Sequence, residues 1–316
     1  MPRSRRYLSG LCIVFLNDEK VKVDVVLSRK GVSMIEERIC RDWLDVQQEL
    51  YANSWDEGLG RHRSPVAFRG LTNAEFQLTT TLQRMGGPYE RLETHLVRNF
   101  SKYAYDMVAS TSPGLVLSPI GSSMWNWLII GRHHGLPTRV LDWTYSPYIA
   151  LHFATEEVQY EIDPVNGVIW CIDYKKAHKL LPKKLQSTLN SSISDVFTVD
   201  MLAQVAVDLD ALNGYGDDSE RSRQFVLFFE PPSLDERVIN QFSLHSMMSS
   251  PTTILDDWLE VHAELCYKIV LPAKIKWEIR DKLDQANINE RILYPGLDGL
   301  CRWLRRYYGP RTIPFS

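Results

Sequence analysis

The spacing of apolar and polar positions divides the chain into short strands and amphipathic helices. Runs of apolar, β-branched and aromatic residues bounded by polar or turn-forming residues predict strands over 8–16, 21–27, 65–68, 167–174, 224–230 and 265–271. Apolar residues that recur every three or four positions predict helices over 35–50, 87–108 and 122–131, and a further helix from Pro147 onward. The polar segment 17–20 separates the first two strands and predicts a β-hairpin.

The predicted strands and helices follow one another without regular alternation. A regular strand-helix-strand order would favour a doubly wound parallel sheet, so the irregular order predicts an α+β fold. We expect one domain over 41–304, built on a mixed or antiparallel split sheet. An N-terminal hairpin extension over 1–40 precedes it, and a basic C-terminal tail over 305–316 follows it.

The stretch 131–157, GRHHGLPTRVLDWTYSPYIALHFATEE, places a group of polar side chains directly before a helix start. Ser146 followed by Pro147 is typical of an N-cap and first helical position, because the hydroxyl accepts a free N–H and proline already has a helical φ. The loop before it brings Asp142, Thr144 and Ser146 to the helix N-terminus. Since that end of a helix favours negative charge, the pattern predicts a site for an anionic ligand.

Composition and charge narrow the classes of protein. The 316 residues are 44% hydrophobic with a net charge of -3, so the chain can form a large core and carries no global basic signal for nucleic acid. Five widely spaced cysteines, mostly in apolar runs, indicate reduced and buried thiols. No apolar run approaches the roughly 20 residues of a membrane helix. We therefore expect a cytoplasmic protein with no membrane partner.

Several residues allow both a functional and a structural interpretation. Arg69, at a strand end, can hold a phosphate or pair with a carboxylate such as Asp142, because both use the same planar fork. Asp142 can also cap its own turn. His133 and His134 lack further ligands at metal-binding spacing, so no metal is expected, whereas His134 can act as an acid or base or be structural. The tryptophans lie in apolar segments and favour a core position.

Five segments together resemble the FRG domain family, which is named for its Phe-Arg-Gly motif. They are AFRG at 67–70, LTTTLQR at 78–84, HHGLPTRVLDWTYSPYIALHFA at 133–154, ERVINQFSLHS at 236–246 and LYPGLDGL at 293–300. The chain departs from the family pattern at Arg132, where a glutamine is common, and at Phe242 and Ser243, where a glycine usually follows the glutamine.

A strand that ends in Arg-Gly, and a Thr-x-Ser strand end that enters a helix, are also similar to the scaffold of mono-ADP-ribosyltransferases. This resemblance implies NAD as the bound substrate and implies that the fold is of the ADP-ribosyltransferase kind. In this resemblance Arg69 corresponds to the arginine that binds the NAD phosphates, and Thr144 with Ser146 to the strand whose hydroxyls orient the ribose. The candidate NAD-binding residues are Arg69, Gly70, Arg139, Thr144 and Ser146, and the candidate catalytic residues are Arg69, His134, Asp142, Thr144, Glu236 and Gln241. No ExE motif is present downstream, so Glu236, Gln241 and Glu264 remain the candidates for the group that stabilises the reacting ribose.

Three functions follow from these observations. The resemblance implies an NAD-binding, ADP-ribosyltransferase-like enzyme in bacterial conflict or defence, with a protein or nucleic acid as the acceptor. An alternative is a non-catalytic FRG module that binds a nucleotide or nucleic acid. A second alternative is a metal-independent hydrolase that uses Asp142 and His134 as an acid/base pair.

Overall fold

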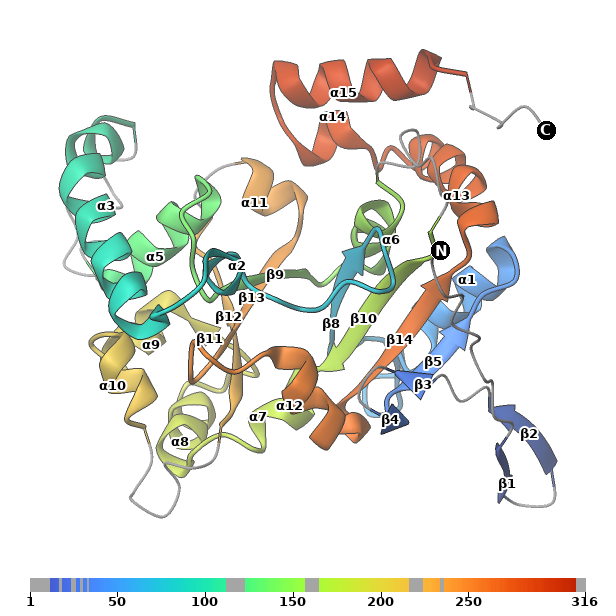
Figure 1. The fold of residues 1–316 in the computed structure, drawn as a ribbon, viewed down its shortest axis with the longest axis horizontal. Coiled ribbons are helices and arrows are strands. Elements are labelled where there is room, and N and C mark those ends of the chain that lie inside the picture. Colours follow the sequence, from blue (N-terminus) through green and yellow to red (C-terminus); the bar gives the residue numbers. More distant parts are fainter. Residues whose placement is uncertain are drawn as a thin grey trace, which may run out of the picture.

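A computed structural model of the chain describes residues 12–16, 19–23, 27–28, 31–32, 34–111, 123–156, 165–215, 224–233 and 236–310. Its centre is an eight-stranded mixed sheet (Figure 1). In sheet order the strands are β11 (Phe197–Thr198), β12 (Val226–Glu230), β13 (Ser243–Met248), β9 (Leu141–Thr144), β8 (Val66–Leu71), β10 (Gly167–Asp173), β14 (Cys266–Leu271) and β5 (Glu36–Ile39). The expected α+β class and mixed sheet are confirmed.

The sheet consists of two halves joined at one point. The pairs β11–β12 and β14–β5 are parallel, and the other neighbouring strands are antiparallel. Between β8 and β9 only Phe68 and Thr144 are paired. The two halves therefore diverge on either side of this pair, which agrees with the expected split sheet.

Helices cover both faces of the sheet (Figure 1). In chain order they are α1 (Trp43–Tyr51), α2 (Thr81–Met85), α3 (Tyr89–Thr111), α5 (Met124–His133), α6 (Pro147–Ala154), α7 (Tyr174–His178), α8 (Lys183–Ser191), α9 (Val199–Val205), α10 (Leu209–Asn213), α11 (Glu236–Asn240), α12 (Leu255–Val261), α13 (Ala273–Gln285), α14 (Glu290–Leu293) and α15 (Leu297–Tyr308). Three two-stranded sheets are separate from the main one: β1 (Cys12–Leu16) with β2 (Glu19–Val23), β3 (Leu27–Ser28) with β4 (Gly31–Val32), and β6 (Trp55–Asp56) with β7 (Arg61–His62). The pairing of β1 with β2 confirms the expected hairpin.

Apolar side chains form three buried clusters. Along β10, Val168, Trp170 and Ile172 enter one cluster while Ile169 and Cys171 enter another, so both faces of this strand are buried. The cluster that contains Ile169 is closed by α1, α6 and α13. The cluster that contains Trp170 takes side chains from both halves of the sheet and so fills the space under the split.

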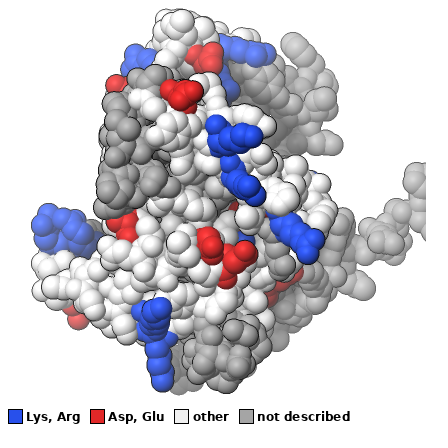
Figure 2. Space-filling model, turned by 90° about the vertical axis from the view of Figure 1, so that its left-hand side faces the viewer, with Lys and Arg blue, Asp and Glu red and all other residues white. Residues whose placement is uncertain are grey.

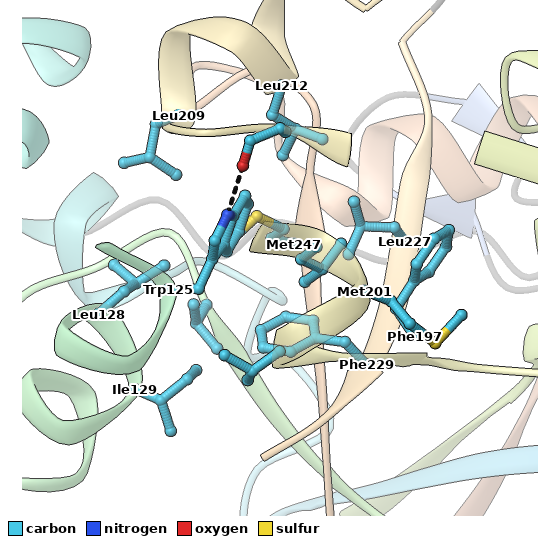
Figure 3. Packing of buried hydrophobic residues seen from close by; sticks show 14 of the residues in the cluster. Trp125, Leu128, Ile129, Phe197, Met201, Leu209, Leu212, Leu227, Phe229 and Met247 are labelled. Atoms are coloured by element: carbon cyan, nitrogen blue, oxygen red, sulfur yellow. Dashed lines mark hydrogen bonds between the residues drawn. The ribbon is translucent and has the colours of Figure 1, made fainter. Parts of the chain in front are cut away.

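The third cluster holds α5 against the half of the sheet that contains β12. Trp125 of α5 is fully buried, and its indole N–H donates to the backbone carbonyl of Ala206 at 2.7 Å. Figure 3 shows this bond beside Leu209 and Leu212, with Phe229 of β12 on the opposite side of the ring. The expected core position of the tryptophans is confirmed for Trp125 and also for Trp127, Trp143, Trp170 and Trp258. The packing of α5 in this cluster and the Trp125 hydrogen bond position the residues at the C-terminal end of the helix.

Some expectations were wrong in their details. The segment 35–50 is not one helix: 36–39 form β5 at the edge of the main sheet, and α1 begins only after Asp42, whose carboxylate accepts the N–H groups of Leu44 and Asp45. Residues before 41 thus contribute a strand to the main sheet, and α15 continues beyond 304 to Tyr308. Cys40, Cys171 and Cys266 are buried free thiols as expected, whereas Cys301 is exposed.

In the described ranges no helix combines the length and the apolar content that a bilayer-spanning segment requires.

Candidate functional site

The point where the sheet splits brings Arg69 to Asp142. Beyond the Phe68–Thr144 pair the strands β8 and β9 no longer share backbone hydrogen bonds. There the Arg69 guanidinium donates from Nη1 to the backbone carbonyl oxygen of Asp142. This side-chain hydrogen bond links the two halves of the sheet at the point where the backbone pairing of β8 with β9 ends. Burial lowers the pKa of Arg69 to about 10, which leaves the group charged at neutral pH.

The Asp142 carboxylate itself is bound by Arg132, not by Arg69. Arg132 lies in the last turn of α5, and its Nε and Nη2 atoms donate to the two oxygens of Asp142 at 3.2 and 2.5 Å. Its third nitrogen, Nη1, donates to the hydroxyl of Thr81 at 3.2 Å. The expected side-chain pair between Arg69 and Asp142 was therefore wrong, because Arg132 forms the bidentate contact with this carboxylate.

A histidine that the sequence did not single out completes the group. His245 of β13 lies opposite Asp142 of β9 in the sheet, and its Nε2 is 3.5 Å from a carboxylate oxygen of Asp142. Burial lowers the pKa of His245 to about 4, with Arg132 adding to the effect and Asp142 opposing it. Burial also acts to raise the pKa of Asp142, but Arg132, His245 and Arg69 outweigh it and hold that pKa well below its usual value. At neutral pH the pair is thus a carboxylate beside a neutral imidazole.

Arg132, Asp142 and His245 line a cavity of about 250 Å³ between the end of α5, helix α11 and the strands β9 and β13. The Asp142 side chain is 48% exposed because it opens into this cavity. No other carboxylate is present among the described residues that line it. The polar residues of the cavity wall include Arg132, His133, Asp142, Arg237, Gln241 and His245.

Helix α11 contributes the Arg237 side chain to the cavity wall. The Arg237 guanidinium lies 5.2 Å from the centre of the Tyr294 ring and makes no ion pair with a carboxylate in the described part of the chain. Gln241, just after α11, donates from Nε2 to the carbonyl of Leu293 at 2.9 Å. Contacts with Leu293 and Tyr294 therefore fix this wall, while the Arg237 charge remains available to a ligand.

Two expected site residues belong to the framework beneath the cavity. The Thr144 hydroxyl donates to the backbone carbonyl of Gln241 at 2.7 Å and accepts the N–H of Ser146 at 3.0 Å. The Ser146 hydroxyl caps α6 by accepting the N–H of Ile149, which confirms the predicted helix start. Both hydroxyls are thus engaged in holding β9, α6 and the end of α11 in place.

Gly70 has a packing role that explains why the motif needs glycine. A Cβ at this position would lie 1.9 Å from the backbone oxygen of Ala150 in α6. Gly167, on the neighbouring strand β10, would bring a Cβ within 2.3 Å of the backbone oxygen of Ala154. The two glycines let α6 lie directly on the sheet.

Arg139, expected to bind the cofactor, lies in a different environment. It is 2% exposed, and its Nε donates to Glu93, which is fully buried, at 2.5 Å. Its Nη1 donates to the side chain of Asn213 and to the carbonyl of Ser249. The structure thus gives Arg139 a structural role, because its charge is matched inside the protein.

Two further expected residues do not reach the cavity. His134 is exposed and forms the C-cap of α5, whereas the preceding His133 lines the wall. The histidine that contacts Asp142 is His245, so the expected pairing of Asp142 with His134 is corrected. Glu236 is exposed at the start of α11 and is not among the lining residues.

Two of the lining residues, Ser243 and His245, could have been predicted from their spacing in the sequence. Ser243 and His245 are two positions apart on β13 and therefore point to the same face of the strand. Both line the cavity, although no hydrogen bond joins their side chains. The role of Arg237 had no local signal, because it depends on where α11 meets β13.

The face that carries α3 and α10 bears side chains of both charges. Figure 2 shows Lys and Arg side chains interspersed with Asp and Glu on a largely uncharged surface. A nucleic-acid footprint usually gathers basic side chains on one face. The described residues of this face therefore lack the clustered basic side chains expected of a broad nucleic-acid interface.

Comparison with known proteins supports the family resemblance over part of the chain. The model of the FRG domain family matches residues 64–162. The matched segment includes Arg69, Arg132 and Asp142, while α11 and β13 lie outside it. No curated protein and no solved structure matches the chain.

Proposed function

We propose that the cavity between α5, α11, β9 and β13 binds the phosphate groups of a nucleotide. The observation that carries the proposal is Arg237, a guanidinium at the wall without a carboxylate partner among the described residues. Arginine binds phosphate through its planar fork, and such charge-assisted bonds are among the stronger contacts in proteins. The framework bonds of Thr144, Ser146 and Gln241 support the proposal because they hold the walls in place before a ligand arrives.

Asp142 would serve a bound nucleotide as an acceptor for ribose hydroxyl groups. Its carboxylate opens into the cavity and is held in one orientation by the Arg132 fork. Arg132 neutralises it, so Arg237 remains as the excess positive charge toward a phosphate. A nucleotide-binding FRG module is the function that this geometry favours.

NAD-dependent ADP-ribosyl transfer is a second candidate, and the Asp142 carboxylate is the observation that favours it. Cleavage of the nicotinamide bond develops positive charge on the ribose, which a nearby carboxylate stabilises. Asp142 has a pKa held well below its usual value and is therefore ionised at neutral pH. In this scheme Asp142 stabilises the reacting ribose, a role that the resemblance gave to a glutamate. Arg237 binds the NAD phosphates, a role that the resemblance gave to Arg69.

Titration of the protein with NAD distinguishes the two functions. Calorimetry measures binding, and chromatography of the same mixture measures free nicotinamide. Binding without release supports the module, and release that Asp142→Asn abolishes supports the transferase. Arg237→Gln is expected to weaken binding of NAD by about tenfold or more, since it removes a charge-assisted contact.

Arg302→Gln is the matched control. Arg302 lies over the same Tyr294 ring as Arg237, also at 5.2 Å, but does not line the cavity. Its replacement should leave affinity unchanged. A folded protein that binds neither NAD nor ADP-ribose, or an affinity that Arg237→Gln leaves intact, would refute the proposal.

A further inference from the structure

A second cavity, of about 280 Å³, lies at the opposite end of the β12–β13 pair from the first. It is bounded by the turn between α7 and α8, by the start of β12 and by α12. Because β12 and β13 are antiparallel, Phe225 at the start of β12 lies at the end of the pair near Met248, whereas Ser243 and His245 of the first cavity lie at the other end. The two cavities share no lining residue.

One wall of this second cavity is aromatic and fixed in place. Trp258 of α12 and His262, which follows the last residue of that helix, are four positions apart, and their ring centres are 4.3 Å apart with a tilt of 41°. The Trp258 indole N–H donates to the backbone carbonyl of Gln224 at 2.9 Å. The His262 side chain is 30% exposed, so its ring faces the cavity beside that of Trp258. Flat aromatic rings of this kind favour a planar aromatic ligand.

The facing wall is cationic and also preformed. Lys179 and Lys183 line it, and neither makes an ion pair with a carboxylate in the described ranges. Gln186 ties the turn between them by donating from Nε2 to the carbonyls of Lys179 and Leu181 at 3.1 and 2.7 Å. No Asp or Glu is among the described lining residues. His262 itself has an acidic neighbour, Glu264, which is 3.9 Å from His262 Nδ1 and 69% exposed.

We propose that this cavity is a second ligand site, for a small planar aromatic ring that carries one phosphate or carboxylate group. The ring stacks on the Trp258–His262 wall while the anion contacts Lys179 and Lys183. A volume of about 280 Å³ lies just below the roughly 300–1,000 Å³ of pockets for drug-sized ligands, so a ligand of the size of a mononucleotide or an aromatic acid fits this cavity. The site does not depend on the function proposed for the first cavity.

The test uses the full chain and four probes: AMP, adenosine, inorganic phosphate and indole-3-carboxylate. The readout is the NMR signal of the Trp258 indole N–H, assigned by its disappearance in Trp258→Phe. AMP or indole-3-carboxylate should shift this signal at concentrations about tenfold below those that adenosine or phosphate requires, because only the first two supply both ring and charge.

Matched variants separate this site from the first cavity. The double variant Lys179→Gln with Lys183→Gln should weaken the response by about tenfold or more. Lys184→Gln changes the charge on the same helix by one unit outside the cavity lining, and it should leave the response unchanged. A response that survives the double variant, one that disappears in Arg237→Gln, or the absence of a shift with every probe would each overturn the proposal.

Discussion

The arginines of the site differ in the atoms they bind, and the sequence alone did not distinguish them. Arg69 and Arg132 both lie near Asp142, yet Arg69 reaches its backbone oxygen and Arg132 its carboxylate. A guanidinium can donate to either acceptor, and the three-dimensional position of α5 decides which arginine meets which one. A motif therefore indicated that Arg69 and Asp142 belong to one site but not which atoms meet.

Replacement of Arg69 tests its role as the tie between the two halves of the sheet. Arg69→Ala should lower the free energy of unfolding by about 1.5–3 kcal/mol, the value of a hydrogen bond from a charged donor. The loss stays in this range because Arg132 continues to neutralise Asp142. Arg69→Lys should recover part of it, since an ammonium can donate to the same carbonyl.

Denaturant unfolding measures both variants. Arg84→Ala is the control, because Arg84 also donates to a backbone carbonyl, that of Thr79, but is exposed. It should change stability by less than about 0.5 kcal/mol. Equal stability of the wild type and Arg69→Ala would contradict the role assigned to Arg69.

At the scale of elements, local signals predicted some helices and strands and missed others. Ser146 with Pro147 marks the start of α6, and the apolar face of 122–131 marks α5, because caps and periodicity act within a few residues. By contrast, β13 has the sequence SLHSMM, whose polar positions gave no clear strand pattern. The edge strand β5 also resembled the start of a helix, since its pairing partner β14 is more than 200 residues away.

Gly70 shows how one position fixes the place of an element. Gly70→Ala should destabilise the fold by about 1–3 kcal/mol or more, the usual cost of overpacking, because the new methyl group meets backbone atoms of α6 that cannot rotate away. Gly58→Ala is the control, since its nearest contact is the side chain of Asp56 at 3.3 Å. Thermal melting of the two variants gives the comparison. If Gly70→Ala melted at the wild-type temperature, α6 would have to lie farther from β8 than the structure places it.

At the scale of the whole molecule, the order of strands was beyond the reach of the sequence. The neighbours β9 and β13, and likewise β8 and β10, are about 100 residues apart in the chain. Local patterns determine whether a segment is extended, but burial of both faces and the close contact of Gly70 and Gly167 with α6 determine which strands pair. The cavity that lies between these strands was therefore predicted only in part, through Asp142.

Three buried histidines, in different parts of the molecule, should make the folded state less stable in acid. Burial lowers the pKa of His178 and His245 to about 4 and holds that of His152 well below its usual value. The partners of His178 fix it as the neutral form, since the N–H of Phe228 donates to its Nε2 and its Nδ1 is 2.8 Å from the carbonyl of Asp195. In the unfolded chain each histidine has a pKa near 6.5. Their contribution to stability is therefore complete above pH 6.5 and is lost as the pH falls toward 4.

Asp256 acts in the opposite direction over part of the same range. Burial raises its pKa to about 6, although its carboxylate accepts the N–H of Leu78 at 2.6 Å. Its contribution to stability is therefore present at low pH and is lost as the pH rises through 6. Between pH 5 and 6 unfolding should take up about three protons on the histidines and release most of one from Asp256.

The free energy of unfolding should accordingly fall by roughly 2–3 kcal/mol per unit as the pH drops from 6 to 5, since each proton contributes about 1.4 kcal/mol per pH unit. Urea unfolding at a series of pH values measures this slope. His178→Gln should make it shallower by about one proton, and Asp256→Asn should make it steeper by somewhat less than one, because the two variants remove titrations of opposite sign. Equal slopes in both variants and the wild type would mean that neither group titrates differently in the folded and unfolded chains.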